Sequence, residues 1–473
     1  MDFFDLLVIG GGINGAAIAR DAAGRGSRVL LVEKDDLAAH TSSASSKLIH
    51  GGLRYLEQFE FRLVREALRE REILLRAAPH IVRPLRFVLP DAPGGRPTWM
   101  VRFGLRLYDM LAGGGSLPRS HRLTRDGPEE APLKRGFSLL GYWDAWVDDA
   151  RLVVLNAVDA AERGAEIATR TEFLAARQSD GGWAAELSGG RTVKARMIVN
   201  AAGPWVREVL QARLGVATGP RVRLVKGSHI AVSRLWDGDQ AYILQQPDGR
   251  VVFALPYGNL ALVGTTDVPV ARPEEAEVTA DEIDYLCAAA NRYFVRQASA
   301  LDVAWSYAGI RALHDDGSSA AKDVTRDYRL ELDGTREAPL LSVFGGKITT
   351  ARALAEEALD RLGLPGGGWT TAARLPGGEA GPIETMSLEW LPPSLLARLA
   401  RAYGSRLGRV TAGAASIEQL GRHFGGGLYE AELRYLVDAE FARTADDILW
   451  RRTKLGLRLT AAECDSLRAY LES

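Results

Sequence analysis

One stretch near the start of the chain, residues 5–34, restricts the fold more than any other. Its sequence, DLLVIGGGINGAAIARDAAGRGSRVLLVEK, places three spaced glycines between two short apolar runs. Gly10, Gly12 and Gly15 have the G-x-G-x-x-G spacing of a turn that joins a buried parallel strand to a helix. The first glycine permits the tight turn, the second lets a pyrophosphate approach the backbone, and the third lets the helix pack closely on the sheet. We therefore expect a strand–helix–strand unit that binds a dinucleotide.

The residue after the second apolar run supports this interpretation. Glu33 lies at the tip of the strand expected at 29–32, where an acid can bind a ribose hydroxyl. A chain with 50 glycines produces G-x-G-x-x-G spacing by chance. The flanking strands, the helix expected at 14–24 and the acid therefore carry the argument, and the pattern does not distinguish NAD from FAD.

Length and composition exclude several classes of protein. At 473 residues, 47% hydrophobic and 25% charged, the chain can form two or three globular domains. The chain has 59 Lys and Arg residues against 60 Asp and Glu residues, so it has no excess of positive charge that would attract nucleic acid. We therefore expect no nucleic-acid partner. No apolar run approaches the roughly 18 residues of a membrane-spanning helix, and no signal-peptide pattern precedes the first strand. We expect a protein that is soluble or lies on a membrane surface.

Disulfide and metal chemistry have little support in the sequence. Cys287 and Cys464 are the two cysteines, too few for a disulfide framework and too far apart for a C-x-x-C site, which indicates a reducing compartment. The seven histidines form no H-E-x-x-H pair, and there is no EF-hand loop. We predict no metal.

A hydroxyl-rich segment, residues 37–55, follows the dinucleotide unit. Serine runs are usually flexible linkers, but this one lies between the cofactor strands and a helix expected at 60–77. A loop that offers backbone N–H groups and hydroxyls to a cofactor fits that place better. The helix at 60–77 alternates Arg and Glu with apolar residues at helical spacing, and we expect its charges to face solvent.

Residues 79–136 are rich in Pro, Gly, Arg and aromatic residues, which indicates an excursion out of the cofactor domain. Within it, residues 99–111 (WMVRFGLRLYDML) mix large apolar side chains with Arg102 and Arg106. A core helix is the favoured interpretation. A helix at a membrane interface is the alternative, because basic and aromatic residues share the segment.

Three later segments predict more of the cofactor domain and an inserted sheet. Residues 197–205 (MIVNAAGPW) form an apolar strand that ends in small residues, where a cofactor can pass close to the backbone. Residues 222–268 contain apolar runs separated by turn sequences, typical of an antiparallel β meander. Residues 340–362 repeat the strand–glycine–helix order of the opening, with paired glycines before Lys347.

The tail beyond residue 365 has no evident chemistry of its own. Its strongest amphipathic segment, residues 430–455, predicts a helix with Arg451 and Arg452 near its end. We expect a small helical domain.

Together these segments predict an α/β chain of three domains. We expect a Rossmann-like FAD-binding domain with an inserted antiparallel β-sheet substrate domain and a small C-terminal helical domain. The expected ranges are 1–78, 137–212 and 330–365 for the first, 79–136 and 213–329 for the second, and 366–473 for the third. FAD fits better than NAD, because widely separated segments reach the cofactor, whereas NAD is usually held by one compact unit.

With these motifs in view, the chain resembles the FAD-dependent glycerol-3-phosphate dehydrogenases of the D-amino-acid-oxidase-like flavoproteins. The motifs that carry the resemblance run along nearly the whole chain: VIGGGINGA, TSSASSKLIHGGLRYLE, WVDDARL, NAAGPWV, KGSHI, GTTD, FGGKITT and LWRRTKLGL. The resemblance implies FAD contacts at Gly10, Gly12, Gly15, Glu33, Ser42, Ser46, Lys47, Leu48, Gly203, Gly346, Lys347 and Thr349. It places Arg54, Tyr55, His229, Arg311 and Lys347 in the substrate pocket. Ala351 departs from the family pattern, in which an aromatic residue is expected.

The residues agree with such a substrate. A phosphomonoester carries about two negative charges and three acceptor oxygens, which Arg54, Arg311 and Lys347 can match. Oxidation of a secondary alcohol also requires that its proton be removed as hydride leaves, and histidine is the side chain poised near neutral pH. His229 is the predicted base, although an isolated histidine on a strand is more often structural, and Lys347 and Tyr55 remain alternatives.

The implied reaction is oxidation of sn-glycerol 3-phosphate to dihydroxyacetone phosphate by hydride transfer to FAD, with the electrons then passed to a membrane quinone. The resemblance implies a cytoplasmic protein bound peripherally to the inner face of the cytoplasmic membrane, and leaves a homodimer open. An oxidase that uses oxygen is the alternative within the family. A flavin-binding protein without turnover is the alternative of another class, disfavoured by the convergent Arg, Lys and His outside the cofactor motifs.

Overall fold

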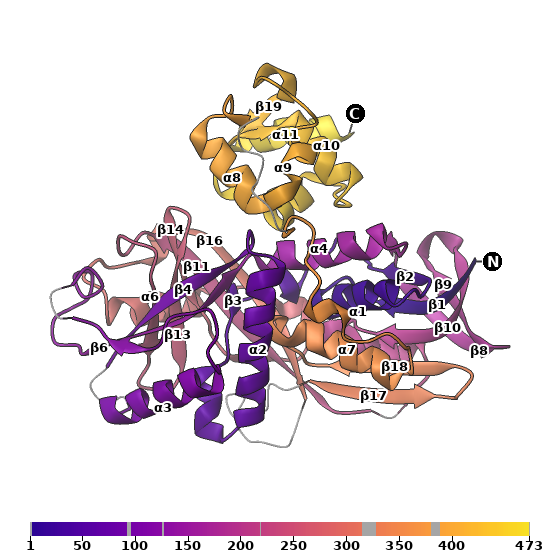
Figure 1. Ribbon diagram of the computed structural model, residues 1–473, viewed down its shortest axis with the longest axis horizontal. Coiled ribbons are helices and arrows are strands. Elements are labelled where there is room, and N and C mark those ends of the chain that lie inside the picture. Colours follow the sequence, from indigo (N-terminus) through magenta and orange to yellow (C-terminus); the bar gives the residue numbers. More distant parts are fainter. Residues whose placement is uncertain are drawn as a thin grey trace.

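Two large sheets and one helical domain make up the chain (Figure 1). The computed structural model describes residues 2–91, 96–124, 127–217, 219–314, 328–379 and 388–472. The predicted fold class is confirmed: a Rossmann-like α/β unit, an inserted sheet rich in antiparallel pairs, and a helical C-terminal domain.

The first sheet is built on the opening strand–helix–strand unit. Its strand order is β17-β18-β10-β1-β2-β7, with the β8–β9 hairpin attached to β10. β1 pairs in parallel with both β2 and β10, as a dinucleotide-binding sheet requires. The strands are β1 (Asp2–Ile9), β2 (Val29–Val32), β7 (Glu166–Ala168), β8 (Phe173–Ser179), β9 (Gly182–Leu187), β10 (Thr192–Asn200), β17 (Arg329–Gly334) and β18 (Pro339–Phe344).

Both faces of β1 are buried, which explains why the opening strand is a continuous apolar run. Leu6 and Val8 belong to a core formed with the helices α1, α4 and α7, whereas Leu7 and Ile9 belong to a core formed with β8, β9 and the chain after β10. The helices that accompany this sheet are α1 (Ile13–Gly24), α4 (Asp149–Glu162), α5 (Val206–Glu208) and α7 (Ala351–Arg361).

The second sheet has ten strands and contains the predicted meander. Its main order is β15-β11-β14-β13-β12-β4-β6-β3, with β16 on β11 and β5 on β6. The antiparallel pairing of β11, β14, β13 and β12 confirms the meander expected at 222–268. Helix α6 (Ala280–Asn291) covers one face of it. The strands are β3 (Leu48–Ile49), β4 (Val82–Pro90), β5 (His121–Arg122), β6 (Leu139–Val147), β11 (Val222–Ser233), β12 (Ala241–Gln245), β13 (Val251–Tyr257), β14 (Leu260–Gly264), β15 (Val268–Val270) and β16 (Val303–His314).

Two strands of this second sheet fall in ranges that we expected in the cofactor domain. β3 pairs with β6, and β6 pairs with β4 along its whole length. The expected domain ranges stay a prediction, although β3 and β6 belong to the second sheet. A strand's partner is set by tertiary pairing, which its own turn signals do not report.

Helix α2 (Phe61–Ala77) carries charges that we expected to face solvent. That expectation is wrong for Glu70 and Arg71, which are both buried. Glu70 forms an ion pair with Arg352 on α7 at 2.6 Å, and Arg71 forms one with Asp144 on β6 at 2.6 Å. These ion pairs connect α2 to α7 and to β6. Loss of either partner would leave a buried unpaired charge, which is strongly destabilising.

Helix α3 (Thr98–Leu111) is not a core helix, so the favoured interpretation of residues 99–111 is wrong. Only Leu105 and Tyr108 of this helix are buried. Trp99, Phe103 and Met110 expose 71%, 66% and 73% of their surface. The segment is amphipathic, but these three large apolar side chains are mostly exposed.

The C-terminal domain has its own core and lies above α4 in Figure 1, on the side of the molecule opposite α3. The helix predicted at 430–455 is wrong, because α10 ends at Asp438 and Phe441 adopts a left-handed φ of 62°. The chain then forms a π-helical turn, η13 (Asp447–Arg452). The domain consists of α8 (Pro393–Tyr403), α9 (Leu407–Val410), α10 (Glu430–Asp438), α11 (Ala461–Glu472) and the hairpin of β19 (His423–Gly425) and β20 (Leu428–Tyr429).

Candidate active site

A cavity of about 880 Å³ lies where the two sheets meet. One end is lined by Gly10 and Glu33, at the carboxyl ends of β1 and β2. The other end is lined by Arg311 of β16 and Lys347, which follows β18. Open α/β sheets bind ligands at the carboxyl ends of their strands. The volume lies in the upper part of the roughly 300–1,000 Å³ range of ligand pockets, which suits a dinucleotide.

The glycine turn keeps the backbone open at the first end of this cavity. Gly10 has a φ of 110°, and a Cβ atom on it would lie 2.6 Å from the carbonyl oxygen of Ala201. A Cβ atom on Gly15 would lie 1.9 Å from the carbonyl oxygen of Gly10, so a larger residue does not fit where α1 approaches the sheet. These residues therefore fit the pyrophosphate of a dinucleotide, with the N-terminus of α1 beside it. Gly15 itself supports the turn from behind and does not line the cavity.

Glu33 lies on the cavity wall with its carboxylate fixed by the backbone. One oxygen accepts a hydrogen bond from the N–H of Gly11 at 2.6 Å, and the other accepts one from the N–H of Asp35 at 2.9 Å. Burial raises the pKa of Glu33, and these two hydrogen bonds oppose that rise. The position agrees with the predicted contact to a ribose hydroxyl.

Within the described part of the chain, one group of side chains has the spacing of a cation site. Glu33, Asp35 and His40 each bring a ligand atom to within 4.8 Å of the others. The Glu33 carboxylate is already engaged by the backbone, and His40 pairs with Asp35 at 2.8 Å. We assign no metal to this group, and the expected absence of a metal stays a prediction.

The hydroxyl-rich segment forms one long wall of the cavity, as the sequence predicted. Ser42, Ser46 and Leu48 line it, as do Gly12, Gly203, Gly346 and Thr349 from other segments. Ser42 also accepts a hydrogen bond from the N–H of Ile13 at 3.0 Å, which links this wall to the start of α1.

Lys47, a predicted FAD contact, turns its side chain away from the cavity. Its ammonium group donates to the carboxylate of Asp149 at 2.6 Å and to the carbonyl of Ser43 at 2.5 Å, and the residue is fully buried. Asp149 also accepts from the N–H and hydroxyl of Ser45. Lys47 therefore holds the wall in place from behind, because the buried carboxylate on α4 attracts it more strongly than the cavity does.

Four of the five predicted substrate residues line the second end of the cavity: Arg54, Tyr55, Arg311 and Lys347. The Lys347 ammonium lies 3.9 Å from the centre of the Tyr55 ring, a cation–π contact. Arg311 donates to Asp267 at 2.6 Å and to the hydroxyl of Thr265 at 3.2 Å. The charge of Arg311 is thus partly compensated before any substrate binds.

The fifth residue, His229, does not line the cavity. It is 1% exposed on β11, and the hydroxyl of Ser46 lies 2.9 Å from its Nε2 atom, between the imidazole and the cavity. The Tyr307 ring stacks on the imidazole with the centroids 4.9 Å apart. Burial, and after it the nearby charges of Lys47 and Arg311, hold the pKa of His229 well below its usual value of 6.5. The side chain is therefore a neutral imidazole at neutral pH.

Two further residues, His50 and Asp267, line this cavity, although the sequence assigned no role to them. His50 lines it beside Thr349, whose hydroxyl oxygen accepts a hydrogen bond from the His50 N–H at 3.4 Å. Asp267 lines it as the partner of Arg311. Both lie inside motifs already singled out, LIHGGLRY and GTTD, but the sequence does not tell which residues of a motif face the cavity.

Comparisons with known proteins agree with this geometry. A family described as FAD dependent oxidoreductase matches residues 5–361, and one described as C-terminal domain of alpha-glycerophosphate oxidase matches residues 364–472. D-erythritol 1-phosphate dehydrogenase of Brucella abortus (strain 2308) is 54% identical, covering 97% of this chain and 96% of that protein. Glycerol-3-phosphate dehydrogenase of Pseudomonas aeruginosa is 50% identical, covering 100% of this chain and 96% of that protein.

A solved structure is similar over the full length. Glycerol-3-phosphate dehydrogenase from Bacillus halodurans complexed with FAD is 27% identical with a TM-score of 0.72, covering 99% of this chain and 94% of that chain. The similarity therefore includes the two sheets and the helical domain together.

Proposed function

Because the chain belongs to the FAD-dependent glycerol-3-phosphate dehydrogenases, we propose that it oxidises sn-glycerol 3-phosphate to dihydroxyacetone phosphate. When bound along the cavity wall that contains Gly10 and Glu33, FAD would supply the acceptor for the hydride of the secondary alcohol. The observation that carries the proposal is the cavity itself, in which a dinucleotide cradle at Gly10 leads to the cationic residues Arg54, Arg311 and Lys347.

The charges at the second end of the cavity suit a phosphomonoester. Asp267 forms an ion pair with Arg311, and the cationic side chains of Arg54 and Lys347 line the same part of the cavity. No acid of the described residues forms an ion pair with Arg54. Two cations, together with the donor groups of Arg311, match a phosphate group with about two negative charges and three acceptor oxygens.

We assign removal of the hydroxyl proton to His229 acting through Ser46. Ser46 lines the cavity and its Oγ atom is within hydrogen-bond distance of Nε2, so it can take the substrate proton while its own proton moves to the imidazole. The route requires an unprotonated Nε2 atom, which the lowered pKa of His229 favours at neutral pH. Lys347, which lines the cavity directly, is the alternative acceptor.

An exposed apolar patch supports attachment to a membrane surface and electron transfer to quinone. Phe59, Trp99, Phe103 and Met110 are all at least 66% exposed, and Arg102 is exposed on the same helix. Such a face is much more apolar than an ordinary soluble surface, and basic residues beside it favour anionic lipid. Across the described residues, the structure has no helix of the length and apolar character needed to cross a membrane.

The patch is continuous with the cavity, whose lining includes Phe59, Phe61, Met100 and Phe103. A quinone dissolved in the lipid would therefore reach the cavity without passing through water. We propose peripheral attachment through α3 to the inner face of the cytoplasmic membrane, with quinone as the second acceptor.

D-erythritol 1-phosphate is a second candidate substrate, favoured by the 54% identity to a D-erythritol 1-phosphate dehydrogenase. Both substrates are phosphorylated polyols, so the same cationic end would bind either phosphate. Turnover in membrane vesicles tests the proposal: dihydroxyacetone phosphate should form from glycerol 3-phosphate with a quinone as acceptor, and much faster than with oxygen. Product formation that needs oxygen and ignores quinone would identify an oxidase instead.

A further inference from the structure

The C-terminal domain contributes one side chain to an aromatic stack that ends on His229. Trp450 of η13 stacks on Trp305 of β16 with the ring centroids 5.4 Å apart and the planes 19° from parallel. Trp305 contacts Tyr307 at 4.6 Å, and Tyr307 stacks on His229 at 4.9 Å and 15°. Four rings thus connect a domain without catalytic motifs to the proposed base.

Tyr307 fixes both the imidazole and the wall that faces the cofactor. Its hydroxyl donates to the carbonyl oxygen of Ser45 at 2.8 Å, and the ammonium of Lys47 lies 4.7 Å from the centre of its ring. Ser46, between these two residues, is the one whose hydroxyl meets Nε2 of His229. A shift of Tyr307 would therefore move His229 and Ser46 relative to each other.

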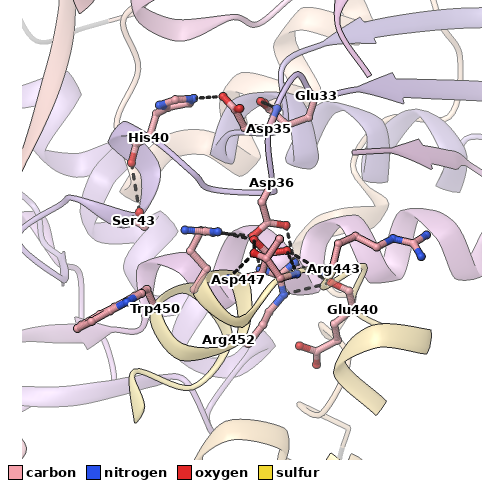
Figure 2. A network of polar contacts seen from close by, with 12 residues as sticks. Glu33, Asp35, Asp36, His40, Ser43, Glu440, Arg443, Asp447, Trp450 and Arg452 are labelled. Atoms are coloured by element: carbon pink, nitrogen blue, oxygen red, sulfur yellow. Dashed lines mark hydrogen bonds and ion pairs between the residues drawn. The ribbon is translucent and has the colours of Figure 1, made fainter. Parts of the chain in front are cut away.

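Trp450 is held at the other end of the stack by buried ion pairs. Arg452 donates to the carboxylate of Asp36 at 2.8 Å (Figure 2). Arg451 donates to the same carboxylate at 2.6 Å, and Arg170 donates to Asp447 at 2.8 Å. Asp36 belongs to the segment between Glu33 and the hydroxyl-rich wall. Figure 2 shows Trp450 extending away from this cluster, so the ion pairs fix the turn while the indole is directed at Trp305.

The stack borders a second cavity of about 250 Å³, whose lining includes Trp305, Tyr307 and Trp450 with Ala39, Thr41 and Ala44 of the cofactor wall. Trp305 also stacks on Tyr257, with the ring centroids 6.1 Å apart. Loss of the Trp450 indole would enlarge the cavity on one side of Trp305. Trp305 would then be free to move toward it, and Tyr307 with it.

We propose that Trp450 is a positioning residue for catalysis, which holds Trp305 and Tyr307 so that His229 and Ser46 keep their hydrogen-bonded geometry. The proposal rests on the proposed function, since it assigns Trp450 to the proton-removal step of that reaction. The C-terminal domain then contributes to catalysis through Trp450, and is not only a covering domain.

The test compares three variants of the full-length FAD-containing protein. Trp450→Ala removes the end of the stack, Trp450→Phe keeps an aromatic ring, and Trp390→Ala removes a half-buried tryptophan that packs against the core of the same domain. The rate of anaerobic flavin reduction at saturating glycerol 3-phosphate is measured for each, with KM, FAD content and the rate of reduction by dithionite, which needs no proton acceptor.

We expect Trp450→Ala to retain FAD and its dithionite rate while flavin reduction by substrate slows about 10- to 100-fold, as for a small misplacement of a reacting group. KM should change little, Trp450→Phe should recover most of the rate, and Trp390→Ala should match the unaltered protein. A Trp450→Ala protein that is reduced at the normal rate overturns the proposal, as does equal slowing in Trp390→Ala.

If Trp450→Ala loses FAD, flavin reduction is measured instead in two other variants, Trp450→Leu and Trp305→Leu. Trp450→Leu keeps most of the apolar volume of the side chain. Normal reduction in either of these FAD-containing variants overturns the proposal, whereas slowing in both supports it. Failure of the proposed function gives a different result, because the unaltered protein itself would then not be reduced by glycerol 3-phosphate.

Discussion

The hydroxyl oxygen of Ser46 lies 2.9 Å from Nε2 of His229, and of the two residues only Ser46 lines the cofactor cavity. The imidazole is therefore one hydrogen bond removed from any substrate. This relationship makes the serine as important as the histidine for proton removal.

Replacement of Ser46 by alanine tests the relay. Ser46→Ala and His229→Asn should each keep FAD but slow anaerobic flavin reduction by about 10²-fold or more, the usual effect of losing a positioned general base. The double variant should be no slower than either single variant, because both remove the same route. Ser43→Ala is the matched control, since Ser43 belongs to the same segment but does not line the cofactor cavity. Normal reduction by Ser46→Ala would assign the proton to another residue.

The pH dependence follows from the lowered pKa of His229. A histidine with a lowered pKa in the folded protein stays neutral as the pH falls through 6.5, so the rate of flavin reduction should be level there and fall only at clearly lower pH. An unperturbed histidine would place this limb near pH 6.5, and burial beside Lys47 and Arg311 moves it lower. Stopped-flow reduction from acidic to mildly alkaline pH measures it. A limb above neutral pH that survives in His229→Asn would indicate Lys347.

The lowered pKa of His229 also affects the stability of the folded protein. Because His229 is protonated more readily in the unfolded chain, its neutral form contributes stability that is fully present above the unfolded pKa near 6.5 and is lost as the pH falls toward the folded pKa. The pKa of His80 is also lowered, to about 4 and chiefly by burial, so His80 changes stability with pH in the same direction. Thermal unfolding at decreasing pH should therefore show a continuous loss of Tm below about pH 6.5.

Arg311 and Asp267 should affect phosphate binding in opposite directions. Arg311→Leu removes a charge-assisted contact of about 1.5–3 kcal/mol, so use of glycerol 3-phosphate should weaken at least ~10-fold. Asp267→Asn removes the carboxylate that forms an ion pair with Arg311 and should lower KM. Oxidation of unphosphorylated glycerol is the control, since neither change should alter it much. Equal losses with both substrates would mean that Arg311 serves the fold or the cofactor.

The apolar face of α3 should be required for membrane attachment and not for flavin reduction. Trp99→Ser combined with Met110→Ser, at exposed positions of α3 that do not line the cavity, should abolish flotation with anionic liposomes and slow quinone reduction. Anaerobic reduction by substrate should stay unchanged. Leu301→Ser, at a 98% exposed position away from α3, is the matched control. Flotation of the double variant at the normal level would contradict attachment through this face.

The ion pairs of the C-terminal turn should contribute to stability. Asp36→Asn leaves Arg451 and Arg452 without their shared carboxylate, and Arg452 and Asp36 are almost fully buried. Such a change should lower the free energy of unfolding by about 3–5 kcal/mol. Chemical denaturation measures it, with Asp465→Asn in an exposed pair as a control that should change little.

Local patterns predicted much of this molecule. Some structures are specified by residues that are neighbours in the sequence. Examples are the glycine turn between β1 and α1, the meander from β11 to β14, and the glycine pair before Lys347. The fold class and FAD followed from these segments, and they are confirmed.

What the sequence did not reveal depends on partners that lie far apart along the chain. Lys47 faces Asp149, 102 residues away, and Arg71 faces Asp144. The exposed face of α3 depends on which of its sides meets the second sheet, and the break at Phe441 depends on where Glu440 must reach Arg151. His229 was identified by its motif, but the interposed Ser46 required the structure.

Anaerobic mixing of the FAD-containing protein with a polyol phosphate tests the central claim most directly. We expect the oxidised-flavin absorbance to be lost rapidly with glycerol 3-phosphate, to be lost more slowly with D-erythritol 1-phosphate, and to persist with glycerol. Flavin that remains oxidised with glycerol 3-phosphate, or that is reduced equally well by unphosphorylated glycerol, would contradict the assignment of this cavity to the oxidation of glycerol 3-phosphate.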